Sequence, residues 1–132
     1  MSPDLGFPLF LGLTVVCLVG ALITGFRARV PLHLTFVTSA LVCLGAAIWF
    51  AIGLGPLYDL ETAQPITGIH LTIAKVATAA YLLPIVTGLR TLRQRTPTHK
   101  RVHLICALVV VVLTLAATAT GAWMLWLAER IA

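Results

Sequence analysis

The chain has 132 residues, of which 60% are apolar and only 10% are charged. Soluble domains are about 45–50% apolar and about 25% charged, and small domains bury only about two thirds of their unfolded surface. The composition therefore argues against a soluble monomer and excludes a disordered chain. The three cysteines are an odd number and lie in apolar runs, which argues against a disulfide-stapled secreted domain. An integral membrane protein remains.

Four apolar stretches reach the length of about 20 residues that a helix needs to cross a hydrocarbon core of about 30 Å. They are residues 7–26, 32–54, 69–89 and 102–127. Lipid offers no partner for free backbone groups, so these stretches must be helices. The connections are short, which favours antiparallel neighbours. We therefore predict an all-α fold: one integral membrane domain over residues 1–132, built as an up-down-up-down four-helix bundle.

The basic residues predict the orientation of these spans. All four acids lie near the chain ends and in the second connection, together with Arg130. Seven basic residues lie in the first and third connections: Arg27, Arg29, Arg90, Arg93, Arg95, Lys100 and Arg101. The positive-inside rule places these two connections in the cytoplasm and both termini on the non-cytoplasmic side of the cell inner membrane. The net charge of +5 then indicates contact with the lipid bilayer and its anionic headgroups, and no nucleic-acid partner is expected.

Prolines mark where the helices should end, start and bend. Gly55-Pro56 ends the second span, because proline cannot extend a helix. Pro65 predicts that the third span begins near residues 64–66, since proline is tolerated at a first helical position. Pro84 is expected to kink this span. Thr96-Pro97 predicts the start of the last helix, with the threonine hydroxyl capping backbone donors.

The four histidines are the candidate ligands. We place His33, His99 and His103 at the cytoplasmic edge of the bundle and His70 at the outer edge. Imidazole is a common ligand of metal ions and of haem iron. Two sites are open: His33 and His103 clamp haem b, or two or three cytoplasmic histidines hold copper. The alternative is that each ring only faces water or lipid phosphate. The candidates for contacts to haem propionates or lipid headgroups are Arg29, Arg90 and Arg101.

A weak internal repeat favours the pairing of His33 with His103. The segment Ile23–Arg27 resembles Val86–Arg90, and each is followed by a His-Leu step that opens the next span. A tandem duplication of a helical pair would place these two histidines at equivalent depth. Glycines within the spans, including those of the two segments, are interpreted as packing positions that let helices approach closely.

Lys75 is a possible intramembrane polar site. It lies about one and a half turns deeper than His70, and a lone lysine there costs about 2–3 kcal/mol unless it reaches the headgroups or finds a partner. Snorkelling toward the outer headgroups is the simplest interpretation. Asp59 or Glu61 could also pair with it. The spans contain no carboxylate, which argues against a proton-relay transporter.

Several marks resemble the DUF420-type membrane proteins over about residues 20–128. They are a basic turn before a histidine (Arg29 to His33), a histidine followed by a Leu-Pro step (His70, Leu83-Pro84), the step His99-Lys100-Arg101 and the step Thr120-Gly121. Members of that family are small four-helix proteins, some linked to assembly of haem–copper oxidases. The resemblance implies ligands at His33, His70 and His99, whereas His103 comes only from the repeat.

We therefore expect a non-enzymatic accessory protein with a histidine-based metal or haem site. Its expected partner is a larger membrane redox complex, such as a respiratory complex, that it helps to assemble or to hold together. No catalytic residue is assigned, because no nucleophile, phosphate-loop or HExxH pattern is present. One alternative is a b-type haem subunit that transfers electrons. A second alternative is a purely structural transmembrane subunit.

Overall fold

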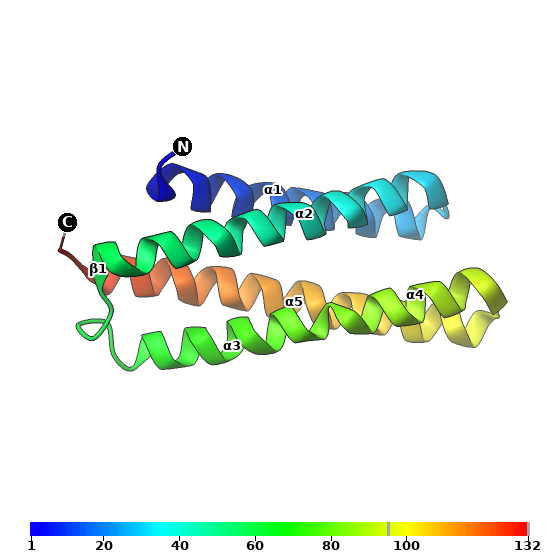
Figure 1. Ribbon diagram of the computed structural model, residues 1–132. Helices are drawn as coiled ribbons and strands as arrows, with labels where there is room; N and C mark the ends of the chain where they lie inside the picture. The colour runs from blue at the N-terminus through cyan, green and yellow to red at the C-terminus, as the bar shows by residue number, and fades with distance from the viewer. Residues whose placement is uncertain (95, 132) are drawn as a thin grey trace. The chain divides into compact units, whose positions relative to one another are not determined.

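The computed structural model describes residues 1–94 and 96–131, and nearly all of them are helical (Figure 1). The predicted all-α class is confirmed. Four helical stretches among these residues are long and apolar enough to cross a membrane. The helices are α1 (Pro3–Phe26), α2 (Val30–Leu54), the 3-10 helix η1 (Gly55–Leu57), α3 (Ile66–Ala80), α4 (Leu82–Gln94) and α5 (Pro97–Leu127).

The helices extend beyond the apolar stretches at their basic ends. Helix α4 continues through Arg90 and Arg93, and α5 begins at Pro97, five residues before the predicted span. Apolarity marks only the hydrocarbon layer, whereas arginine, lysine and glutamine are good helix formers outside it. The predicted cap is confirmed, because the backbone N–H of His99 donates to the Thr96 hydroxyl at 3.3 Å.

The third span is broken where Pro84 requires it. Helix α3 ends at Ala80 and α4 starts at Leu82, so the break falls on Tyr81. Proline at residue i cannot donate to the carbonyl of residue i−4, and its ring clashes with that carbonyl. Residue i−4 is Ala80 here. The Tyr81 hydroxyl lies 3.0 Å from the Thr114 hydroxyl of α5, so the break also brings a tyrosine into the helix pair.

The chain forms two compact units. The N-terminal unit contains Met1–Ala63 and the segment from Leu127 onward, and the C-terminal unit contains Gln64–Trp126. In the first unit α1 packs antiparallel against α2, and in the second the α3–α4 stretch packs antiparallel against α5 (Figure 1). The up-down-up-down order of all four spans stays a prediction, as does a single domain.

Close approach of small residues holds the helix pair of the N-terminal unit together. A Cβ on Gly6 would lie 2.6 Å from the Phe50 ring, and one on Gly20 would lie 2.6 Å from the Phe36 ring. Phe10 stacks on Phe50 with ring centroids 5.6 Å apart. The buried Thr14 donates its hydroxyl proton to a carbonyl of its own helix, as is common in membrane helices.

The second connection and the C-terminal segment form a short ladder that the sequence did not predict. Strands β1 (Tyr58–Asp59) and β2 (Glu129–Arg130) are antiparallel, with Tyr58 opposite Arg130. Arg130 also forms an ion pair with Asp4 at 3.1 Å. Within the N-terminal unit, the start of α1, the connection after α2 and the C-terminal segment therefore lie at one end. The side of the membrane on which this end lies stays a prediction.

The turn between α1 and α2 contains a left-handed residue. The N–H of Arg29 donates to the Thr24 carbonyl at 3.0 Å, and the N–H of Ala28 donates to the Gly25 carbonyl at 3.1 Å. This is the Schellman pattern of a helix C-terminus, in which the residue after the cap is usually glycine. Here that residue is Ala28, with φ of 53°. An L-residue with a Cβ is strained in this conformation.

We expect Ala28→Gly to stabilise the protein by about 0.5–1 kcal/mol, because glycine adopts positive φ without a Cβ clash. Thermal unfolding in mild detergent should then show a melting temperature higher by a few degrees. Ala28→Val is the matched control, and it should lower the melting temperature because a β-branched side chain tolerates positive φ least. An unchanged melting temperature in both variants would contradict the strain.

Candidate histidine ligand site

His33 lies in the first turns of α2 and is held by α1. Its Nδ1 is 2.8 Å from the Ala21 carbonyl oxygen. Gly25 stands one turn after Ala21, and a Cβ on Gly25 would lie 3.2 Å from the same Nδ1. The missing side chain therefore lets the ring reach the carbonyl. A carbonyl can only accept, so Nδ1 is the nitrogen that donates its proton in this contact.

His103 is held in the same way within the C-terminal unit. Its Nδ1 is 3.2 Å from the Thr87 hydroxyl, which donates its own proton to the Leu83 carbonyl at 2.7 Å. With that proton on the Leu83 carbonyl, the Thr87 hydroxyl is placed to accept from Nδ1 of His103. A Cβ on Gly88 would lie 3.1 Å from the ring. His103 therefore has the same glycine support as His33.

His70 has a third contact of this kind, between α3 and α5. Its Nδ1 lies 3.2 Å from the Thr120 hydroxyl, which donates to the Ala116 carbonyl at 2.8 Å. The ring also hydrogen-bonds to the backbone of Ala117, one turn before Gly121. A Cβ on Gly121 would lie 2.8 Å from the ring, the tightest of the three approaches. His70 and His103 lie near opposite ends of the C-terminal unit, as predicted.

A Thr-Gly step opposite each of these histidines is the feature that sequence reasoning missed. The three steps are Thr24-Gly25, Thr87-Gly88 and Thr120-Gly121. The sequence predicts these glycines as packing positions, and the structure shows that each of them faces an imidazole ring. The signal was present in the sequence, because two of the steps belong to the internal repeat. What was missing was the register that sets each step against a histidine of the neighbouring helix.

His99 is not held in this way. It lies in the first turn of α5, where its backbone N–H donates to Thr96 and its carbonyl accepts from the Thr91 hydroxyl at 3.1 Å. Both contacts belong to the backbone and fix the corner between α4 and α5. No three His, Cys, Asp or Glu side chains within the described residues lie close enough together to hold a metal ion. The copper site stays a prediction.

The arginines proposed for propionate or headgroup contacts lie beside the histidines of their own units. Arg29 precedes α2 by one residue and is one turn from His33. Arg101 stands two residues before His103, and Arg90 stands two residues after Gly88. All three arginines are exposed. Each arginine therefore lies within four residues, along the chain, of a histidine or of the glycine that faces it.

The residues present fit a haem or metal group. Histidines that ligate metals almost always donate their other ring nitrogen to a carbonyl or a similar acceptor, which fixes the tautomer and the ring orientation. His33 and His103 each show this arrangement, and each ring occupies space that a Cβ at the facing glycine would fill. Each of the two rings would suit a haem or metal as a single ligand from its own unit, and arginines lie near each ring in the sequence.

No family model, curated protein or solved structure matches this chain. The resemblance to DUF420-type proteins therefore stays a prediction.

We expect Gly121→Ala to destabilise the protein by about 1–3 kcal/mol, because the new Cβ would overpack against the His70 ring. Gly12→Ala is the matched control, since nothing lies within 4 Å of a Cβ at that position. That variant should be neutral or slightly stabilised by the better helix propensity of alanine. Thermal unfolding of both variants in detergent makes the comparison. Equal melting temperatures of the two variants would mean that the contact between Gly121 and His70 does not contribute to stability.

Proposed function

We propose that this chain is a small membrane protein that binds haem b through histidine and serves a larger membrane redox complex as an accessory subunit. The observation that supports this proposal is that His33 and His103 each place Nδ1 within hydrogen-bond distance of the neighbouring helix and each lie near arginines in the sequence, which His70 does not. Such bonding is typical of histidines prepared for ligation through Nε2. Histidine that only faces the membrane surface needs neither the hydrogen bond nor the facing glycine.

The proposed axial ligands are His33 and His103. The two residues occupy equivalent places in their own helix pairs: each lies near the start of its helix, faces a Thr-Gly step and is followed by leucine. The proposed propionate contacts are Arg29, Arg90 and Arg101. A bound haem would supply reversible one-electron chemistry, and the role of the chain is to hold its iron by imidazole and to keep it in an apolar environment.

Two other roles share parts of this evidence. An electron-transfer subunit would use the same ligands, and it differs from an assembly factor only in whether the haem is reduced during turnover of the complex. A purely structural subunit is favoured by the fact that histidine and threonine also join membrane helices by hydrogen bonds. In that case the three histidine contacts would hold helix pairs together and bind nothing.

The spectrum of the purified protein tests the haem. In mild detergent, we expect a sharp alpha band and a Soret shift in the reduced-minus-oxidised spectrum. His33→Ala and His103→Ala should each abolish this signal by removing an axial ligand. His70→Ala and His99→Ala are the matched controls and should retain it, because neither residue is a proposed ligand of this haem. Circular dichroism should show that all four variants remain helical.

Each other outcome decides against part of the proposal. Loss of the haem signal in His70→Ala alone would refute the ligand assignment. A colourless protein with one equivalent of copper by elemental analysis would favour the copper site. A colourless protein without metal that co-purifies with a large complex would favour the structural subunit.

We also propose that the basic connections face the cytoplasm of a cell with an inner membrane, and that both chain ends lie on the opposite side. The positive-inside rule supports this orientation. Alkaline phosphatase fused after β2 should be active, because it folds only outside the cytoplasm, whereas a fusion after Arg93 should be inactive. Green fluorescent protein at the same two positions is the reciprocal control. Active phosphatase at Arg93 would reverse the orientation.

A further inference from the structure

Lys75 is the one Lys, Arg, Asp or Glu residue within the four predicted spans. It lies nine residues after Ile66, the first residue of α3, which is about two and a half turns or about 14 Å along the helix axis. Its side chain is exposed, and it makes no hydrogen bond or ion pair within the described part of its own unit. An ammonium group at this depth is costly unless it finds a partner or reaches the headgroups.

Lys75 belongs to a polar and small-residue side of α3 that points away from α5. At about 100° per residue, the buried residues Ile66, Ala77 and Tyr81 fall on one side of the helix, where His70 meets Gly121. The opposite side carries a row that we name the Lys75 face: Gly68, Thr72, Lys75 and Ala79, beside the exposed Leu71. All of these residues are exposed. The face is therefore not used for packing within the C-terminal unit.

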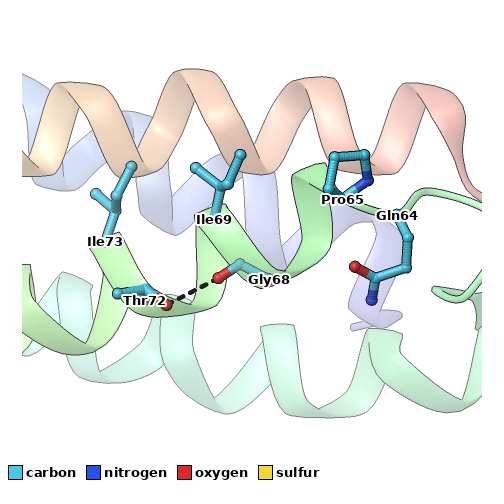
Figure 2. Close-up of a pocket in the computed structure, with 6 residues that line it drawn as sticks. All are labelled: Gln64, Pro65, Gly68, Ile69, Thr72 and Ile73. Carbon is cyan, nitrogen blue, oxygen red and sulfur yellow. Dashed lines mark hydrogen bonds between the residues drawn. The ribbon is translucent and has the colours of Figure 1, made fainter.

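An open hollow lies at the end of the Lys75 face nearest the start of α3. Gln64, Gly68 and Thr72 line an open hollow of about 530 Å³ together with Pro65, Ile69 and Ile73 (Figure 2). The Thr72 hydroxyl donates to the Gly68 carbonyl at 2.9 Å, so its only proton is used within its own helix (Figure 2). Small residues at such a spacing let a second transmembrane helix approach closely.

The charges of the chain show what kind of helix suits this face. No Asp or Glu occurs anywhere between Gln64 and Trp126, so the C-terminal unit has no carboxylate for Lys75. The acids of the chain all lie outside the spans, and one of them, Asp4, is already paired with Arg130. A second copy would bring the same set of acids at the same positions. A carboxylate at the depth of Lys75 itself would therefore have to come from a different protein.

We propose that the Lys75 face binds a transmembrane helix of another membrane protein, one that carries Asp or Glu at the depth of Lys75. The ammonium and the carboxylate form an ion pair in the membrane, which removes the cost of each isolated charge. Gly68, Thr72 and Ala79 allow the backbones to approach on either side of this pair. The interface is independent of the haem, because neither His33 nor His103 belongs to it.

Cross-linking tests which molecule occupies the face. A photo-reactive phenylalanine analogue replaces Thr72 in the full chain, expressed in its own host membrane. We expect one cross-linked product with a different membrane protein whose sequence carries Asp or Glu within a span. The same analogue at Val112, an exposed position of α5, is the control and should give no such product. Products with lipid alone, with a second copy, or within one chain would each overturn the proposal.

Charge exchange tests the ion pair itself. Lys75→Leu should reduce the co-purified partner by about tenfold, while Lys75→Arg should retain it. Lys75→Asp should also lose the partner, and replacing the partner's acid by lysine should restore it. Full retention of the partner in Lys75→Leu, or no restoration by the exchange, would overturn the proposal. The haem spectrum of Lys75→Leu should match that of the wild type, which separates this result from failure of the haem site.

Discussion

Three histidine rings form hydrogen bonds to a neighbouring helix because each of those helices lacks a side chain opposite the ring. A ring N–H turned toward a packed neighbouring helix must find its acceptor on that helix. In a helix, each backbone carbonyl accepts from the N–H of the residue one turn later, and the side chain of that residue covers the carbonyl. Glycine at that residue opens the carbonyl of Ala21 to His33 and the backbone of Ala117 to His70. In each case the glycine has no side chain, and the histidine ring occupies that space and contacts the neighbouring helix.

The same constraint shapes the remainder of each helix pair. Buried positions are mostly alanine, glycine and threonine, and the threonines return their protons to their own backbones. In lipid there is no hydrophobic driving force between helices, so helices associate through close packing of small residues and through hydrogen bonds. Glycine makes room for two larger rings, Phe36 and Phe50, in the N-terminal unit. Polar side chains therefore take part in helix pairing at the positions where glycine makes room.

The sequence predicted the elements better than their contacts. The four spans, the break at Pro84 and the cap at Thr96 follow from local chemistry, because apolar length, a missing donor and a hydroxyl act within a few residues. The contact between His33 and Gly25 joins two helices, so the residues near each of them in the sequence do not predict it. Spans of nearly uniform apolarity have almost no polar side to read, so the register between helices stayed hidden. The β1–β2 ladder was missed because two-residue strands carry no periodic signal.

The ladder at the outer end has a practical consequence. Asp4 holds Arg130, and Tyr58 lies opposite Arg130 in the ladder, so residues near the two extremities of the polypeptide are neighbours once the N-terminal unit has folded. A reporter enzyme divided into two fragments, one genetically attached at each extremity, would be brought together by folding of one molecule. Its signal would then report correct folding of the protein in living cells. The same signal would not be evidence for dimerisation, because both fragments are on one molecule.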